Sequence, residues 1–117
     1  MLDTTNVLGV FKDGKLFVRG PISMYQFFEF AKYGVNAARI FMYIRMQEGR
    51  LVSKKLLEPK QHTFIKLDNK NLEAVAGVHK SHKWDRLRAL EQSGLIELKV
   101  NGAGYAPEAK IIIPPLH

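Results

Sequence analysis

A cluster of cationic and hydrogen-bonding side chains lies in the third quarter of the 117-residue chain. Its basic members are Lys80, Lys83, Arg86 and Arg88, and its other polar members are Ser81, His82 and Asp85. Ammonium and guanidinium groups bind phosphate, and a guanidinium also pairs with two acceptors at once. This cluster can therefore bind an anionic polymer, provided that one element holds its members on an exposed face.

The residues around the cluster predict a single helix. Gly77-Val78 forms a turn, His79 caps the first helical turn, and the helix runs from residue 80 to residue 93. Gly94 supplies the left-handed conformation that commonly ends a helix. A helix of this kind would fix the cluster in space.

A helical projection predicts which members of the cluster face outward. Leu87 and Leu90 lie near Trp84 on this projection, so we expect that side to be buried. The stem of Lys83 flanks the buried side, and its ammonium is expected to reach solvent. The outward face then consists of Ser81, His82, Asp85, Arg86 and Ala89.

Other chemistries have little support in the sequence. His79 and His82 have the spacing of a metal-binding pair, but the chain has no cysteine and no carboxylate set beside them. The serines lack the Gly-flanked turn of a hydrolase nucleophile, and Gly102-Ala103-Gly104 lacks the following helix of a phosphate-binding loop. The sequence therefore predicts no metal, no cofactor and no enzymatic activity.

Composition and charge favour an anionic partner. The formal net charge is +7, and residues 49–117 hold twelve of the 18 basic residues but seven of the 11 acidic ones. A basic surface attracts polyanions because each phosphate contact releases condensed counterions. The length predicts one domain, residues 1–117, without an apolar run long enough to span a membrane and without a secretion signal. We expect a cytoplasmic, nucleoid-associated protein.

The first half of the chain predicts a hairpin and two helices. An Asp-Gly pair between two β-favouring runs predicts an N-terminal hairpin over residues 1–20. Residues 22–49 are expected to form both helices. The first begins with a Ser-x-x-Gln capping box and stops at Gly34, and the second is capped by Asn36 and stops at Gly49.

The first of these helices is rich in large apolar side chains. They are Met24, Tyr25, Phe27, Phe28, Phe30 and Tyr33. One interpretation is core packing beneath the N-terminal hairpin. The other is a homodimer surface, because exposed aromatic residues mark contact sites between proteins.

Residues 64–113 predict the elements that would position the basic cluster. A short strand over residues 64–67 is followed by a helix that Asp68 caps and that ends at residue 76. After the basic helix, alternation of apolar and polar residues predicts a strand from Ile96 to Val100. A turn rich in Asn and Gly then leads to a second strand over residues 109–113.

This order of elements resembles the winged helix-turn-helix superfamily of bacterial DNA-binding proteins. The resemblance covers residues 36–113 and is carried by ARIFMYI, FIKL, LDNKNLEAVAGV and GLIEL…AKIII. It implies an α+β fold with an added N-terminal hairpin and helix, a recognition helix at residues 80–93 and a wing at residues 95–113. It also implies that the partner is double-stranded DNA, which a dimer would bind at a palindromic site.

The resemblance suggests roles for the cluster in the major groove. Arg86 is the best candidate to read a base, because a guanidinium matches the acceptor pair of guanine. Ser81 and His82 would contact a base or a phosphate. Lys80 and Lys83 would bind phosphates, which contributes affinity but no sequence preference.

The remaining candidates lie beside or beyond the basic residues. Asp85 would orient Arg86, accept a hydrogen bond from cytosine, or repel the DNA backbone. In the wing, Lys99, Asn101, Tyr105 and Lys110 would contact the flanking DNA. Together these residues predict a sequence-specific DNA-binding protein, a transcriptional regulator above all.

Two other functions remain open at this point. The same helix and wing can serve as a protein-interaction surface, because a fold does not determine a function. The chain could also be an accessory factor for replication of a plasmid or mobile element, with the same DNA chemistry.

Overall fold

The computed structural model describes residues 22–58 and 61–114. The elements in order are α2 (Met24–Ala31), α3 (Val35–Ser53), β1 (Ile65–Lys66), α4 (Asn69–Ala76), α5 (Lys80–Gln92), β2 (Ile96–Lys99) and β3 (Glu108–Ile111). The hairpin predicted over residues 1–20 lies outside the described residues.

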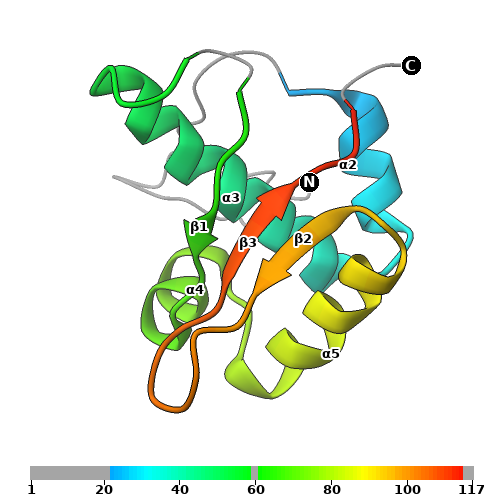
Figure 1. Ribbon diagram of the computed structural model, residues 1–117. Helices are drawn as coiled ribbons and strands as arrows, with labels where there is room; N and C mark the ends of the chain where they lie inside the picture. The colour runs from blue at the N-terminus through cyan, green and yellow to red at the C-terminus, as the bar shows by residue number, and fades with distance from the viewer. Residues whose placement is uncertain (1–21, 59–60, 115–117) are drawn as a thin grey trace.

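The described part of the chain has an α+β architecture with four helices and one small sheet. The three strands are antiparallel in the order β1-β3-β2, so β3 is central. Figure 1 shows the sheet in front of α3, with α4 and α5 below it and α2 to one side. This arrangement is compatible with a winged helix but is not specific to it.

The bounds of α4 and α5 confirm the predicted caps. The carboxylate of Asp68 accepts from the backbone N–H of Asn71 at the start of α4, and Gly77 ends that helix with φ of 73°. At the start of α5, Nδ1 of His79 accepts from the backbone N–H of Ser81. Each cap satisfies a backbone group that the end of a helix leaves without a partner.

The predicted ends of α3 are wrong. Its N-cap is Gly34, with φ of 104°, and not Asn36. The helix also continues through Gly49, which is buried, to Ser53. Packing of α3 in the core outweighs the roughly 1 kcal/mol that a glycine costs inside a helix.

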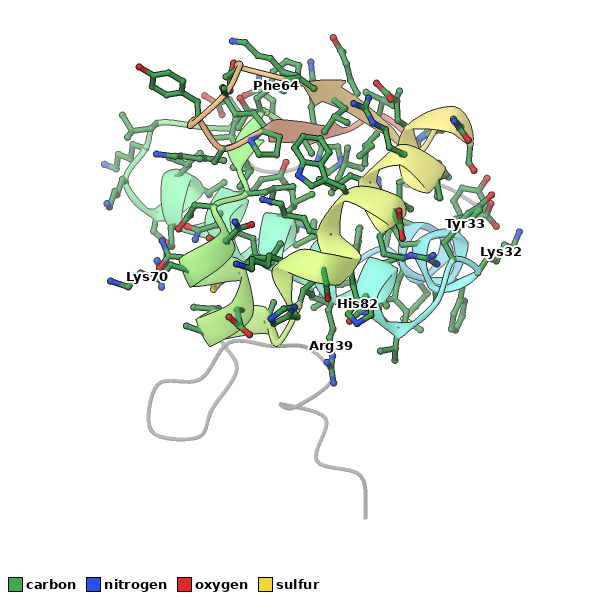
Figure 2. The ribbon with its side chains drawn as sticks, turned by 90° about the horizontal axis from the view of Figure 1, so that it is seen from below. Lys32, Tyr33, Arg39, Phe64, Lys70 and His82 are labelled. Atoms are coloured by element: carbon green, nitrogen blue, oxygen red, sulfur yellow. The ribbon has the colours of Figure 1, made fainter. Side chains whose placement is uncertain are left out.

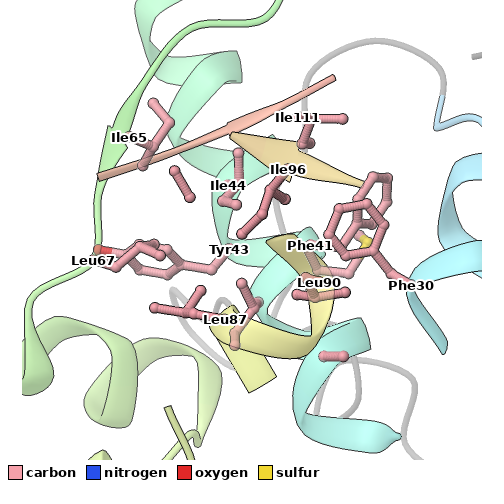
Figure 3. Close-up of a cluster of buried hydrophobic side chains, with 14 of the residues drawn as sticks. Phe30, Phe41, Tyr43, Ile44, Ile65, Leu67, Leu87, Leu90, Ile96 and Ile111 are labelled. Atoms are coloured by element: carbon pink, nitrogen blue, oxygen red, sulfur yellow. The ribbon is translucent and has the colours of Figure 1, made fainter. Parts of the chain in front are cut away.

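Most of α3 is enclosed by the other elements, which makes it the central helix. Its residues Ile40, Phe41, Tyr43 and Ile44 are almost completely buried. Figure 3 shows side chains from α2, β1, α5, β2 and β3 converging on it. Within this cluster are Phe30, Ile65, Leu67, Leu87, Leu90, Ile96 and Ile111.

The apolar side chains of α2 are divided between the core and the surface. Phe30 is completely buried, and its ring centroid lies 4.8 Å from that of Phe41. Its predicted place in an exposed dimer surface is therefore wrong. Phe27 and Tyr33 are partly buried against the core, whereas Met24 and Phe28 are 57% and 56% exposed. Only part of the predicted apolar set is available to a partner.

A buried polar network joins α2 and α3 to the segments around the sheet. The Glu48 carboxylate, which is fully buried, accepts from Nη1 of Arg45 at 2.9 Å and from Nδ1 of His62 at 2.9 Å. Nε2 of Gln26 lies 3.2 Å from Nε2 of His62 and donates to the carbonyl of Ile113 at 2.8 Å. A buried carboxylate is stable only when hydrogen-bond donors surround it. Glu48 is the acceptor that Arg45 and His62 share, so this network depends on Glu48.

We predict that Glu48→Gln lowers the free energy of unfolding by about 2 kcal/mol, because it replaces charge-assisted hydrogen bonds with weaker ones. The new amide N–H₂ would also face donors. Urea unfolding followed by circular dichroism measures the change. Glu58→Gln, at an exposed position, serves as the control. Equal midpoints for the two variants would contradict the prediction.

Candidate nucleic-acid interface

The buried side of α5 consists of residues at helical spacing. They are Lys83, Leu87 and Leu90, and all three pack toward the core. The exposed residues of the helix are Lys80, Ser81, His82, Trp84, Asp85, Arg88 and Gln92. The helix is therefore rotated relative to the predicted projection, although Lys80, Ser81, His82 and Asp85 remain exposed as expected.

Lys83 is a buried lysine, so its predicted contact with a DNA phosphate is wrong in this arrangement. The residue is only 3% exposed, and its Nζ donates to the carbonyl of Leu67 at 3.1 Å. Burial lowers the pKa of Lys83, and attraction to Asp68 acts in the opposite direction. The ammonium thus joins α5 to the segment that precedes α4.

The projection placed Trp84 on the buried side of the helix, but Trp84 does not anchor the helix in the core. It is 38% exposed, and the guanidinium carbon of Arg88 lies 5.4 Å from its ring centroid. The predicted rotation was wrong because the projection placed this indole on the buried side and expected the ammonium of Lys83 to reach solvent. The spacing of Lys83 with Leu87 and Leu90 was the sequence signal for the correct rotation.

Arg86 is half-buried, and its predicted place on the outward face is wrong. Its Nη1 donates to the carbonyl of Tyr33 at 2.9 Å, in the turn between α2 and α3. Nη1 also lies 3.8 Å from the position that a Cβ would take at Gly34. Arg86 therefore connects α5 to this turn, while Arg88 takes the outward position.

The polar side chains in the first turn of α5 differ in whether they already take part in a hydrogen bond. The Ser81 hydroxyl lies 2.8 Å from Nδ1 of His79, so it takes part in the helix cap. Lys80 and His82 are exposed, and no hydrogen bond to either side chain occurs among the described residues. In the view of Figure 2, α4 and α5 lie nearest the viewer, and His82 lies on this side of the molecule.

The hairpin of β2 and β3 adds two cationic groups, which contact an aromatic ring in the segment before β1. Nζ of Lys99 and Nζ of Lys110 each lie 5.9 Å from the ring centroid of Phe64. Lys99 is exposed, whereas Lys110 is only half-exposed. Cation–π contacts of this kind hold both ammonium groups on the outer face of the sheet.

The loop of this hairpin is closed by Asn101. Its Nδ2 donates to the carbonyl of Ala106 at 3.0 Å and to Oε2 of Glu108 at 2.9 Å. Tyr105, in the same loop, is 74% exposed. Asn101 therefore has a structural role that the sequence did not reveal, and Tyr105 is free to contact a large partner.

Sequence reasoning missed two further exposed cations near these elements. Lys66 lies on the outer face of β1, and Lys70 lies in the first turn of α4. Figure 2 shows Lys70 extending from the edge of α4. They became relevant only once the fold paired β1 with β3 of the hairpin and packed both α4 and α5 against α3.

Two other kinds of site are not found within residues 22–58 and 61–114. No group of three His, Cys, Asp or Glu side chains there has the arrangement of a metal site. In the same ranges, no helix has both the length and the apolar character to span a membrane.

Comparison of the chain with protein-family models, with curated proteins and with solved structures finds no match.

We predict that Lys83→Met gains a stability advantage at pH 7 from removal of a charge that burial penalises, and that this advantage offsets the loss of the donor to the carbonyl of Leu67. The advantage should shrink as the pH rises from the lowered pKa of Lys83 toward its ordinary value of 10.5. Across that window the folded wild type binds fewer protons at Lys83 than the unfolded chain, so its stability rises. Urea unfolding at several pH values measures the difference.

Burial raises the pKa of Tyr43, which reduces stability at pH values above 10.0. This effect is shared by the wild type and the variant, so it cancels in their difference. A difference that stays constant with pH would show that the lysine charge is not the cause.

Proposed function

We propose that this protein binds double-stranded DNA as a winged helix-turn-helix. In this proposal α4 is the positioning helix, α5 is the recognition helix, and the hairpin of β2 and β3 is the wing. The single observation that supports it best is the face of α5 opposite Lys83, Leu87 and Leu90, which is exposed and polar. A helix fits the major groove of B-DNA when such a face is clear of the protein body.

The chemistry of this face suits a duplex. Lys80 and Arg88 supply positive charge, and His82 supplies ring nitrogens that can bind a base edge or a phosphate. Arg88 replaces Arg86 as the candidate for reading guanine, since only Arg88 lies on the outward face. Its contact with Trp84 limits the motion of the guanidinium, which reduces the entropy lost on binding.

The elements around α5 would add contacts to the DNA backbone. Lys70 in α4 and Lys99 in the wing are exposed cations, and Tyr105 extends the wing loop. Phosphate contacts of this kind contribute affinity without sequence preference. They also make binding depend on salt, because bound cations leave the DNA as the protein binds.

A protein partner is the second candidate, and one residue favours it. Asp85 is exposed in the middle of the outward face of α5, where its carboxylate would repel a nearby phosphate. A protein surface with an arginine or lysine would accommodate it. Binding of the wild type to no duplex would favour this candidate.

A second copy of the chain is the partner we propose for α2. Met24 and Phe28 expose large apolar side chains on one short helix, and such residues are enriched in dimer contacts. Two copies related by a two-fold axis would match a palindromic DNA site.

For DNA binding, we predict that labelled random-sequence duplex binds the wild type with an affinity that falls as salt rises. On a duplex selected from that pool for tight binding, Arg88→Ala should weaken binding by about 1–3 kcal/mol while leaving stability unchanged, because the side chain is exposed. Fluorescence anisotropy measures the affinity. The single tryptophan, Trp84, gives a second signal that should change on binding.

Arg86→Ala serves as the contrasting variant. It should lower the free energy of unfolding by about 1–2 kcal/mol, because the carbonyl of Tyr33 loses a charged donor. Among folded molecules it should bind DNA almost as the wild type does. Salt-independent binding, or an equal loss of affinity in both variants without a loss of stability, would contradict this assignment.

For self-association, we predict that the mass in solution rises from 13.3 kDa toward the dimer value with increasing concentration. Phe28→Lys should keep the protein monomeric, because it places a charge in the contact. Leu56→Lys, at another exposed apolar position, should not. Light scattering after size-exclusion chromatography measures the mass. A monomer at every concentration would refute the dimer.

A further inference from the structure

Arg39 lies close to the turn that joins α4 to α5. It belongs to the N-terminal part of α3, and its Nη1 donates to the carbonyl of Gly77 at 3.2 Å. A Cβ at Gly77 would lie 3.2 Å from the same nitrogen. The glycine, in the left-handed conformation with φ of 73°, thus leaves room for the guanidinium against the turn.

Most of the hydrogen-bonding capacity of Arg39 is unused. A guanidinium has five N–H donors, and the carbonyl of Gly77 is the acceptor that the structure gives it. The Nε group is buried without a partner. Among residues 22–58 and 61–114, no carboxylate forms an ion pair with Arg39, whereas Arg45 and Arg88 each pair with a glutamate.

Arg86 and Arg39 each donate to the carbonyl of a turn, but the two hydrogen bonds differ in length and in burial. Arg86 makes a 2.9 Å hydrogen bond in a partly buried setting, which suits a purely structural contact. The hydrogen bond of Arg39 is longer and exposed. The turn thus holds Nη1 of Arg39 and Nε is buried, whereas Figure 2 shows the end of the side chain extending away from the molecule, an arrangement that suits an oxyanion.

The position of Arg39 relates it to the face of α5. Figure 2 shows Arg39 extending from the lower edge of the molecule, below His82 in this view, whereas Lys70 extends from another edge. Gly77 precedes α5 by only the residues Val78 and His79, so Arg39 lies close to the beginning of that helix. It is not on the outward face of α5, where bases would be read.

We propose that Arg39 binds a backbone phosphate of the duplex whose major groove α5 enters. This inference rests on the proposed function and adds a contact from α3, an element outside the helix-turn-helix and the wing. The phosphate accepts hydrogen bonds from guanidinium N–H groups that the turn does not use. Arg39 thereby fixes the position of α5 on the DNA without contributing to sequence preference.

The test compares Arg39→Ala with Arg50→Ala, which removes the same charge from an exposed position near the other end of α3. Affinity for labelled random-sequence duplex is measured by anisotropy over a series of salt concentrations. We expect Arg39→Ala to weaken binding about tenfold at low salt, and to reduce the slope of log affinity against log salt by about one. Arg50→Ala should change neither quantity.

The slope of log affinity against log salt distinguishes the loss of a phosphate contact from an indirect effect through the turn at Gly77. If Arg39→Ala lost affinity with an unchanged slope, Arg39 would act only through Gly77 and the inference would be overturned. Unchanged affinity and slope, with Arg88→Ala still weakened, would overturn the inference and leave the proposed function standing. Failure of the wild type to bind any duplex would instead overturn both.

Two further variants keep the test decisive if Arg39→Ala does not fold. Arg39→Lys retains the charge and should keep most of the slope. Arg39→Gln retains an amide donor without the charge and should lose about one unit of slope. Thermal unfolding identifies which variants are folded, and identical slopes for these two substitutions would contradict the proposal.

Discussion

The packing of Lys83, Leu87 and Leu90 against the core determines which side of α5 is available for binding. Leu87 and Leu90 are completely buried, so rotation of the helix would expose apolar surface at a cost of roughly 1.5–3 kcal/mol for each side chain. Lys83 adds a directional contact, because its ammonium donates to the carbonyl of Leu67. The exposed polar residues of α5 are therefore a consequence of what its other side buries.

The helices around α5 are held by hydrogen bonds to turns. Arg86 of α5 donates to the carbonyl of Tyr33, and Arg39 of α3 donates to the carbonyl of Gly77. Each of these bonds joins one helix to the loop between two others. The positions of α3, α4 and α5 are thus interdependent.

A separate polar network holds the opposite region of the fold. Glu48 accepts from Arg45, His62 and the backbone of Thr63, and the network reaches Ile113 through Gln26. These groups come from α2, α3 and the segments before and after the strands. A network of this kind selects one arrangement of α2 on α3, because a buried carboxylate tolerates few alternatives.

Local chemistry in the sequence determined α4, α5 and the strands, because their caps and apolar periodicity involve residues close together in the chain. Asp68, His79 and Gly77 act as predicted. Tertiary contacts decided the rotation of α5 and the burial of Phe30, because long-range packing selects among faces that local patterns leave nearly equal. The outward position of Arg88, in place of Arg86, follows from that packing and from the carbonyl of Tyr33, which lies far away in the sequence.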